Sequence, residues 1–275
     1  MAAPNPSRAV IVTGAARGIG RAFTLGLLRA GHAVLAVDRL EEQLAALAAE
    51  AAAPDRLHTL AADLTRPEVP EQVIQAALAR FGRVEALVNN AGIGIGAIRP
   101  DNWRNPLRFW DVTPQQWQDF LAINATAGIR LAQLAAPHLM RQGWGRVVSV
   151  TTSLGTMLRG GYLPYGASKA ALEAATAIMA EDFAGTGVTA NVLVPGAVTD
   201  TPLVPEQSGF RRDQLMPPAR MAPPLVWLMS DAANAVTGRR FLAVHWDESL
   251  PGEQAAAKAG APIGWKGIAA LPLTF

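Results

Sequence analysis

The chain has 275 residues and a formal net charge of +2; 50% of its residues are hydrophobic and only 17% are charged. This composition is typical of one compact domain with a large core and excludes an intrinsically disordered chain. The basic residues form no run longer than two, which argues against a nucleic-acid-binding surface.

Short apolar runs alternate with helical patterns along most of the chain. Strands are predicted at residues 9–12, 33–37, 57–61, 86–88, 146–150, 189–194 and 240–244. Helices are predicted at residues 17–30, 40–52, 70–81, 114–142, 165–185 and 223–229, with a bend near Pro137 in the fourth. This alternation, with right-handed crossovers, predicts a single-domain α/β fold of three layers, in which a doubly wound parallel sheet of the Rossmann type lies between helices.

Three stretches interrupt this alternation. Residues 93–111 and 199–221 are rich in glycine or proline, and loops of this length in a compact domain are usually functional. The tail, residues 246–275, reads as irregular. We therefore expect a flexible N-terminus over residues 1–7, a domain over 8–245 with two substrate loops, and a C-terminal extension over 246–275. The extension is expected to cover either a neighbouring subunit or the substrate cleft.

Several classes of site and location are not expected. The chain has no cysteine and its four histidines are far apart, so no disulfide, thiol nucleophile or metal site is predicted. No apolar run approaches the roughly 18 residues that a membrane span needs, and the first residues lack the apolar segment of a signal peptide. A cytoplasmic protein without membrane contact is expected.

A glycine-rich loop follows the first strand and opens the first helix, in the run Thr13-Gly14-Ala15-Ala16-Arg17-Gly18-Ile19-Gly20. Gly14 allows a tight turn, and Gly18 and Gly20 let the backbone approach a pyrophosphate at the helix N-terminus. The alternative is a strand–helix turn without a ligand. The strand–turn–helix context and the later Asp38 favour dinucleotide binding.

Asp38 ends the second predicted strand, 20 residues after Gly18. A carboxylate at this point can accept hydrogen bonds from the adenosine ribose and repels a 2′-phosphate, which favours NAD. Arg17 and Arg39 favour NADP instead, because either can pair with that phosphate. NAD is the preferred cofactor, with NADP as the alternative, and Asp38 is also compatible with capping the following helix.

Tyr165 and Lys169 form a Tyr-x3-Lys pair in a chain with only two tyrosines and three lysines among its 24 basic residues. Chance produces such a pair about 2% of the time, which limits the false-positive risk. Residues four apart share one helix face, so the ammonium can lie beside the phenol. An ammonium there favours the tyrosinate and makes the phenol a proton donor and acceptor.

With these motifs the chain resembles the short-chain dehydrogenase/reductases in their single-domain form, over about residues 7 to 245. The shared motifs occur in the family's order and spacing. They are the glycine loop, Asp63-Leu64, Asn89-Asn90-Ala91-Gly92, Tyr165-x3-Lys169 and Pro195-Gly196.

The resemblance implies catalytic roles for three residues. Tyr165 would be the general acid in ketone reduction and the base in alcohol oxidation. Lys169 would hold the nicotinamide ribose and favour the tyrosinate. Asn124 would link Lys169 to bulk water through a chain of waters, although alone it reads as a helix-surface residue.

The resemblance also implies cofactor contacts. Asn90, Ala91 and Gly92 would pass beside the adenosine ribose, with Asp63 at the adenine amine and Leu64 against the ring. Val198, after Pro195 and Gly196, would contact the nicotinamide carboxamide. Read without the resemblance, Asp63 is a loop or cap residue, and Asn89 and Asn90 tie strands together.

The chain departs from the family pattern at two contacts. The family's serine, 13 residues before the tyrosine, is Thr152 here, and Ser153 follows one residue out of register. Thr152 is the preferred hydroxyl for the substrate oxygen and Ser153 the alternative. The usual threonine after Pro195-Gly196 is Asp200, so Thr199 or Thr201 would take its place.

The residues expected around Tyr165 predict an apolar or aromatic ketone or secondary alcohol as substrate. The expected walls are Leu154, Met157, Leu158, Tyr162 and the 203–210 loop, and Trp103, Phe109 and Trp110 either rim the pocket or fill core or interface. An NAD(P)-dependent ketoreductase or alcohol dehydrogenase follows. The rivals are a non-catalytic dinucleotide-sensing protein and a lyase or epimerase that uses its cofactor transiently. Alanine-rich helices near 114–142 and 165–185, with the resemblance, imply a homodimer or homotetramer.

Overall fold

The computed structural model describes residues 7–265, which form one eight-stranded sheet between two layers of helices. The strand order is β3-β2-β1-β4-β5-β6-β7-β8, with β1 to β7 parallel and β8 antiparallel to β7. The strands are β1 (Ala9–Thr13), β2 (Ala33–Asp38), β3 (Leu57–Ala61), β4 (Ala86–Asn89), β5 (Gly145–Val150), β6 (Val188–Val194), β7 (Arg239–Leu242) and β8 (Gly260–Pro262). The predicted doubly wound α/β fold is confirmed.

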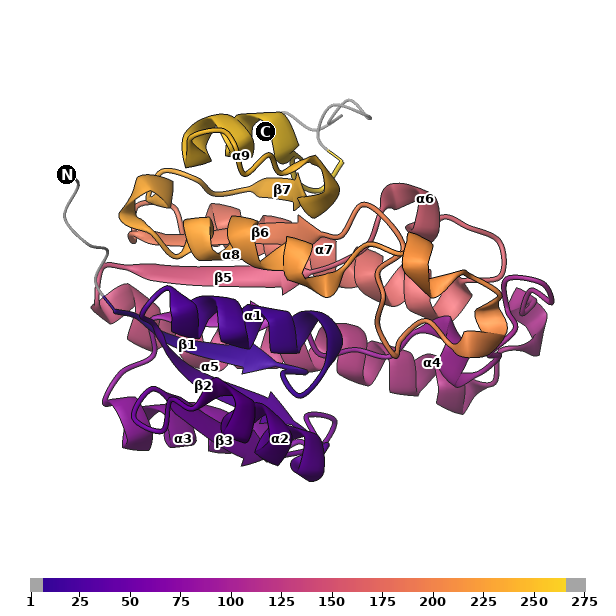
Figure 1. The fold of residues 1–275 in the computed structure, drawn as a ribbon, viewed down its shortest axis with the longest axis horizontal. Coiled ribbons are helices and arrows are strands. Elements are labelled where there is room, and N and C mark those ends of the chain that lie inside the picture. Colours follow the sequence, from indigo (N-terminus) through magenta and orange to yellow (C-terminus); the bar gives the residue numbers. More distant parts are fainter. Residues whose placement is uncertain (1–6, 266–275) are drawn as a thin grey trace.

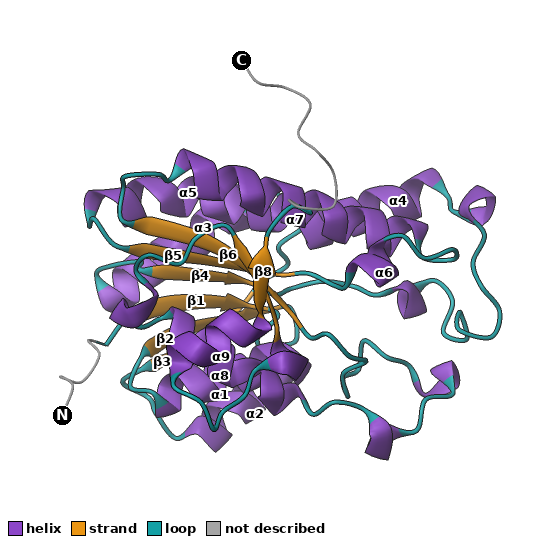
Figure 2. Ribbon diagram, turned by 90° about the horizontal axis from the view of Figure 1, so that it is seen from above, coloured by secondary structure: helices purple, strands orange, loops and turns teal. Residues whose placement is uncertain are grey.

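Helices cover both faces of the sheet, as Figure 2 shows. One face carries α1 (Gly18–Arg29), α2 (Glu41–Ala51), α8 (Ala222–Leu228) and α9 (Gly252–Ala259). The other carries α3 (Val69–Phe81), α5 (Ala127–Arg141) and α7 (Leu163–Asp182). The strands β1, β4, β5 and β6 are buried on both faces, which explains continuous apolar runs such as Val10 to Val12.

The carboxyl ends of the strands define the functional end of the molecule. The chain order reverses between β1 and β4, which are neighbours in the sheet, and ligands of such folds bind in the crevice at this switch point. α4 (Pro114–Leu121), α6 (Leu154–Met157) and the two predicted substrate loops extend beyond the same end (Figures 1 and 2).

The predicted long helix over residues 114–142 is interrupted at a different place from the one expected. α4 ends at Leu121, a π-helical turn occupies Ala122–Thr126, and α5 then continues through Pro137. The predicted long helix is therefore broken around Asn124, whereas Pro137 does not end α5. Single π-helical turns inside helices are frequent at functional sites.

The expectation of an irregular tail after residue 246 is wrong for its first part. α9 buries Ala255, Ala256 and Ala259 in the same core as Trp246, and β8 pairs with the outer edge of β7. This pairing satisfies an edge that would otherwise present unpaired backbone groups. Residues 266–275 of the tail, and residues 1–6 of the expected flexible N-terminus, lie outside the described residues.

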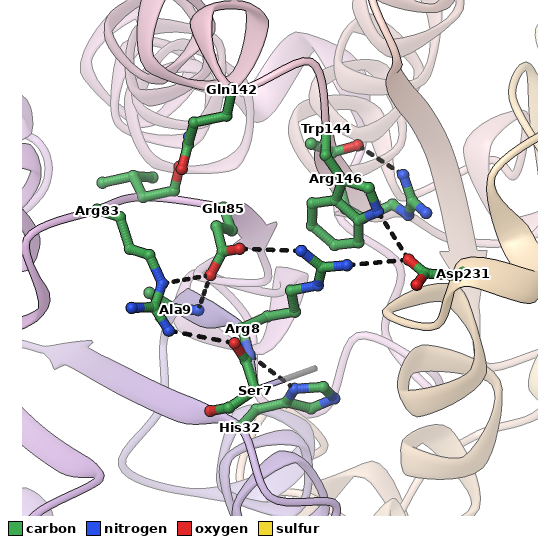
Figure 3. Close-up of polar contacts among 12 residues, drawn as sticks. Ser7, Arg8, Ala9, His32, Arg83, Glu85, Gln142, Trp144, Arg146 and Asp231 are labelled. Atoms are coloured by element: carbon green, nitrogen blue, oxygen red, sulfur yellow. Dashed lines mark hydrogen bonds and ion pairs between the residues drawn. The ribbon is translucent and has the colours of Figure 1, made fainter. Parts of the chain in front are cut away.

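A polar cluster, here called the amino-edge cluster, lies at the amino ends of the strands, opposite the candidate site (Figure 3). It consists of Arg8, His32, Arg83, Glu85, Trp144, Arg146 and Asp231. The Trp144 ring contacts two guanidinium groups, with Arg8 Cζ 3.7 Å and Arg146 Cζ 4.1 Å from its centroid. Glu85 accepts from Arg8 at 3.0 Å and from Arg83 at 2.8 Å. The cluster ties the segment before β1 to the starts of β4 and β5.

Two further features are absent from residues 7–265. No helix there has both the length and the apolar character needed to cross a bilayer. No group of three or more histidine or acidic side chains in that range is placed to hold a metal ion.

Candidate active site

Tyr165 and Lys169 lie on the face of α7 that packs against the end of β5. The helix begins at Leu163, with Pro164 in its first turn, so the two side chains are separated by one turn. The ammonium Nζ of Lys169 donates a 3.0 Å hydrogen bond to the Val150 carbonyl. Only 4% of Lys169 is exposed, and this burial lowers its pKa to about 8.

Tyr165 is half-buried, and burial raises the pKa of its phenol to about 12. A hydrogen bond with the Thr152 side chain acts in the opposite direction and lowers the pKa. In the free protein, burial therefore outweighs the expected effect of the neighbouring ammonium. The phenol carries its proton at neutral pH and can donate it.

The two candidate hydroxyls before Tyr165 are used differently. Thr152 interacts with the phenol of Tyr165. Ser153 is the N-cap of α6, where its Oγ accepts from the Thr156 N–H at 3.2 Å and contacts Thr156 Oγ1 at 2.9 Å. The structure thus brings Thr152, and not the Ser153 hydroxyl, to the predicted acid/base.

Asn124 is buried inside the π-helical turn, with only 1% of its surface exposed. Its Oδ1 accepts from the Ile93 N–H at 2.8 Å, and its Nδ2 donates to the Ile93 carbonyl and to Ser168 Oγ, both at 3.0 Å. The alternative of a helix-surface residue is therefore wrong. Asn124 fixes the start of the first substrate loop against α7.

Gly92 is the point where the loop after β4 comes close to the candidate residues Asn124 and Lys169. A Cβ atom on Gly92 would lie 2.7 Å from Asn124 Oδ1 and 3.2 Å from Lys169 Nζ. Because real Cβ atoms do not approach this closely without a shift, the position requires glycine. Gly92, Asn124 and Lys169 thus meet at one place.

The glycine loop is tied to the end of β4. Thr13 Oγ1 accepts from the N–H groups of Asn90 and Ala91 at 3.0 and 3.1 Å. Asn90 Nδ2 donates to the carbonyls of Thr13 and Gly14 at 2.9 and 3.1 Å. A Cβ on Gly20 would overlap the Gly14 carbonyl, so the turn depends on glycine there. Asn90 thus has the structural role expected for it, which is compatible with a cofactor contact.

Asp38 reaches across from β2 to the same loop. Its Oδ2 accepts from the Ala16 N–H at 3.0 Å and its Oδ1 from the Leu40 N–H at 3.2 Å. Leu40, not Asp38, is the N-cap of α2. Arg17 and Arg39, the two candidate phosphate partners, are both exposed.

Asp63 and Leu64 follow β3 at the far side of this crevice. The Asp63 carboxylate is exposed and accepts from the N–H and hydroxyl of Thr65, and these bonds hold its pKa below the usual range. Leu64 is buried. The loop-cap role of Asp63 is therefore observed, with Leu64 packed beneath it.

The segment after β6 closes the opposite side of the crevice. It contains Pro195, Gly196 and Val198, of which Val198 is 38% exposed. The two threonines proposed as substitutes, Thr199 and Thr201, are buried, whereas Asp200 pairs with Arg212 at 2.9 Å. Thr201 lies against the glycine loop, because a Cβ on Gly18 would be 3.0 Å from its methyl carbon.

The two predicted substrate loops contact each other above the site. The side chain of Leu203 lies where a side chain on Gly94 would be, and Pro205 does the same at Gly96. The rings of Trp103 and Phe210 are 4.8 Å apart, and Arg159 Cζ lies 3.8 Å from the Trp103 ring. No sequence pattern indicated that Arg159 stacks on Trp103.

The predicted pocket walls are only partly enclosed. Met157 is buried, whereas Leu158 is 77% exposed and so does not line an enclosed pocket. Phe109 and Trp110 pack edge to face at 4.9 Å, yet they are 66% and 69% exposed. The core-filling alternative is wrong for these two residues.

Two charged residues beside the site were missed. Glu173, one turn after Lys169, is completely buried, and its carboxylate accepts from the guanidinium of Arg240 at 2.9 Å. Neither residue belongs to a motif, and a glutamate within a helix reads as a solvated residue. No signal in the sequence identified the pair.

Comparisons with known proteins agree with this architecture. A family model described as short chain dehydrogenase matches residues 8–211. The chain is 28% identical over 239 residues to a 3-oxoacyl-(acyl-carrier-protein) reductase of Thermotoga maritima, covering 83% of this chain and 93% of that one. It is 28% identical over 258 residues to the fluoren-9-ol dehydrogenase of a Terrabacter species, covering 87% and 71%.

A solved structure shows the same fold. The crystal structure of a short-chain dehydrogenase from Streptomyces avermitilis superposes with a TM-score of 0.62 at 32% identity, covering 70% of this chain and 66% of that one. The match of the family model spans most of the domain that carries the crevice and the Tyr165–Lys169 pair. The chain belongs to the short-chain dehydrogenases, a family of oxidoreductases that use a nicotinamide cofactor.

Proposed function

We propose that the protein transfers a hydride between NAD and an apolar or aromatic ketone or secondary alcohol, with Tyr165 as acid and base. The observation that carries the proposal is the convergence of three groups, two from α7 and one from the segment after β5. The Tyr165 phenol interacts with Thr152, and Lys169 Nζ lies one helical turn away beside Gly92. Acid/base, substrate hydroxyl and cation thus surround one point.

The residues of the crevice fit a dinucleotide. Gly14 and Gly20 form a tight turn at the N-terminus of α1, because a Cβ on them would overlap Ala91 or the Gly14 carbonyl, and a helix N-terminus attracts a pyrophosphate. When bound, the cofactor supplies or accepts the hydride. We assign the loop, including Arg17 and Ile19, to the pyrophosphate, and Asp63, Leu64, Asn90, Ala91 and Gly92 to the adenosine. Pro195, Gly196 and Val198 are assigned to the nicotinamide.

Asp38 supports NAD over NADP. Two backbone N–H groups hold its carboxylate at the end of β2, and a fixed negative charge there repels a 2′-phosphate. The exposed guanidinium groups of Arg17 and Arg39 support the alternative.

The proton moves through Tyr165. In ketone reduction the protonated phenol, oriented by Thr152, donates to the substrate oxygen. In alcohol oxidation Tyr165 accepts that proton, which requires its pKa to fall from about 12. The Lys169 ammonium and the positive nicotinamide ring both act in that direction. We assign Asn124 to the relay that returns the proton to solvent from Lys169.

The substrate class is inferred from the residues near the site. Leu203 and Trp103, each 42% exposed, offer apolar and aromatic surface on the two loops at this end of the molecule, and the ring of Phe210 packs against Trp103. The name of the Terrabacter relative specifies fluoren-9-ol, an aromatic secondary alcohol, which agrees with such a surface.

We further propose that the protein is a homodimer or homotetramer. Met140 on α5 and Leu163 and Ile178 on α7 are large apolar side chains exposed on the outer helix layer. Because β8 pairs with the outer edge of β7, two subunits cannot join their sheets through β7. Light scattering coupled to size exclusion tests the assembly state.

A screen of apolar ketones and alcohols, run with NADH and NADPH in parallel, tests the proposed reaction. Turnover is followed by the near-ultraviolet absorbance of the reduced nicotinamide. We expect turnover with aromatic ketones, and its loss in Tyr165→Phe, which removes one oxygen while NADH binding persists. Tight NADH binding without turnover of any substrate would instead favour a non-catalytic sensing protein. Product formation without net cofactor change would favour a lyase or epimerase.

A further inference from the structure

One face of α7 makes polar contacts with four consecutive residues at the end of β5. Thr176 Oγ1 contacts Ser149 Oγ at 2.8 Å, and Lys169 Nζ reaches the Val150 carbonyl at 3.0 Å. Glu173 Oε2 accepts from the Thr151 hydroxyl at 2.8 Å. Tyr165 interacts with Thr152. Glu173 therefore binds the residue immediately before the substrate hydroxyl.

The second carboxylate oxygen of Glu173 binds an arginine from another strand. Arg240 on β7 donates from Nε to Glu173 Oε1 at 2.9 Å, and the Glu173 side chain is completely inaccessible to solvent. The same guanidinium donates from Nη2 to the Thr152 carbonyl at 3.1 Å. One planar group thus spans Glu173 and the backbone of Thr152.

The two bonds hold Thr151 and Thr152 from both sides. β5 ends at Val150, so the backbone beyond it has left the ladder of the sheet. The Thr151 hydroxyl, the Thr152 carbonyl and the Thr151 N–H, which donates to the Leu193 carbonyl at 3.2 Å, fix this segment. The Thr152 side chain is then directed at Tyr165.

Stability alone does not account for such a pair. Burying two charges costs much of what their attraction returns, and apolar residues of similar volume often replace a buried ion pair without loss of stability. A specific geometric role explains its presence better.

We propose that Glu173 and Arg240 are positioning residues that hold the Thr152 hydroxyl on the Tyr165 phenol during the reaction. The inference rests on the proposed function of Tyr165 and Thr152, and neither Glu173 nor Arg240 touches the reacting atoms. It follows that disturbing the pair slows the chemical step while cofactor binding persists.

Two variants test the role, because either single removal of a charge risks unfolding. Arg240→Lys keeps the charge beside Glu173 but lacks the planar fork that reaches both partners. The double variant Glu173→Leu/Arg240→Met removes both charges together. Arg239→Met is the matched control, since neighbouring strand residues point to opposite faces and Arg239 faces away from Glu173.

We expect both variants to fold and to bind NADH as the wild type does. With a substrate found in the screen, kcat falls by about tenfold or more, because small misplacements of reacting groups are costly. KM changes less than kcat, and the basic limb of the pH profile moves to higher pH. Arg239→Met stays at the wild-type values. Unchanged kcat and pH profile in both variants would overturn the proposal.

A spectroscopic measurement tests the positioning role of Glu173 and Arg240 even when no substrate is turned over. The chain has two tyrosines, so labelling only the hydroxyl-bearing ring carbon Cζ with ¹³C gives two resonances, assigned with Tyr162→Phe. We expect the Tyr165 resonance to move in both variants, and to stay in place in Arg239→Met. Failure of the wild type to turn over any substrate would count against the proposed function. A Tyr165 resonance that stays at its wild-type position would count against the positioning role.

Discussion

The ammonium of Lys169 donates to the Val150 carbonyl at 3.0 Å from a position that is only 4% exposed to solvent. One carbonyl acceptor replaces the water shell that the ammonium has in the unfolded chain. The pKa of Lys169 is accordingly lowered from 10.5 to about 8. The buried position of the Lys169 ammonium therefore reduces the stability of the fold at neutral pH.

Lys169→Met should remove a pH-dependent destabilisation. Below about pH 8 both states of the wild type bind the proton, and the folded state bears the full cost of the buried charge. Between about pH 8 and 10.5 the unfolded state binds more protons, so wild-type stability rises with pH. The shift in the pKa of Lys169 corresponds to about 3 kcal/mol of unfolding free energy. The difference in unfolding free energy between Lys169→Met and wild type should shrink by that order from pH 7 to pH 10.

Denaturant unfolding of the two proteins at several pH values measures this difference. Contributions from titrating groups remote from Lys169 are present in both proteins and cancel. The folded wild type keeps the Tyr165 proton through this range, since the pKa of that phenol is raised to about 12. If the difference in unfolding free energy stays constant across this pH range, burial does not lower the pKa of Lys169.

Much of the fold could be predicted because parallel strands buried on both faces need continuous apolar runs. Val10 to Val12 of β1 and Ala86 to Val88 of β4 show this pattern, and the two strands are neighbours inside the sheet. The break at Asn124 could not be predicted, since a π-helical turn has no residue signature and its neighbours favour helix. Pro137, the expected bend, remains inside α5. The helix is interrupted where Asn124 makes tertiary hydrogen bonds with Ile93 and Ser168, and a local sequence pattern does not reveal such contacts.

Thr152→Ala and Ser153→Ala should separate activity from stability. Thr152→Ala removes the hydroxyl beside Tyr165, and we expect kcat/KM to fall at least about tenfold, which corresponds to about 1.4 kcal/mol. Ser153→Ala removes the N-cap of α6, which costs about 1 kcal/mol of stability. It should leave kcat/KM nearly unchanged. Steady-state kinetics and thermal melting of both variants provide the measurement, and reversed effects would assign the substrate hydroxyl to Ser153.

Charge at Asp38 should decide between the two nicotinamide cofactors. We expect the wild type to prefer NADH, and Asp38→Asn to raise kcat/KM for NADPH relative to NADH by about tenfold, since the repulsion of the 2′-phosphate is removed. Arg39→Met is the informative comparison, because it removes the exposed cation next to Asp38. A wild type that prefers NADPH, and loses this preference in Arg39→Met, would contradict the assignment of NAD.

The residues around the site were predicted unevenly for a physical reason. Tyr165 and Lys169 lie four positions apart, so helix geometry alone brings them together. Glu173 and Arg240 lie 67 positions apart, and only the assembled sheet places β7 beside α7. β8 was missed for a similar reason. Its short Gly-Ala-Pro run has no β-branched residue, and it forms because it pairs with the free edge of β7.

The amino-edge cluster should make stability sensitive to mild acid. His32 Nδ1 accepts the Arg8 N–H at 3.2 Å, which requires that nitrogen to be unprotonated (Figure 3). Burial, followed by the positive charge of Arg8, lowers the pKa of His32 below 6.5. As pH falls through 6.5 and below, the unfolded chain binds the proton more readily than the folded one. Stability is therefore lost as pH falls in this range, until the folded state also takes up the proton.

His32→Asn is the matched variant, since an amide oxygen can accept the same N–H but does not titrate. We expect the melting temperature of this variant to depend less on pH between about pH 7 and 5 than that of the wild type. Carboxylates that titrate in the same range affect both proteins equally. The turnover number at neutral pH should be the same in both, because the cluster lies at the opposite ends of the strands from Tyr165. Parallel melting curves across this range would show that His32 does not carry the acid sensitivity.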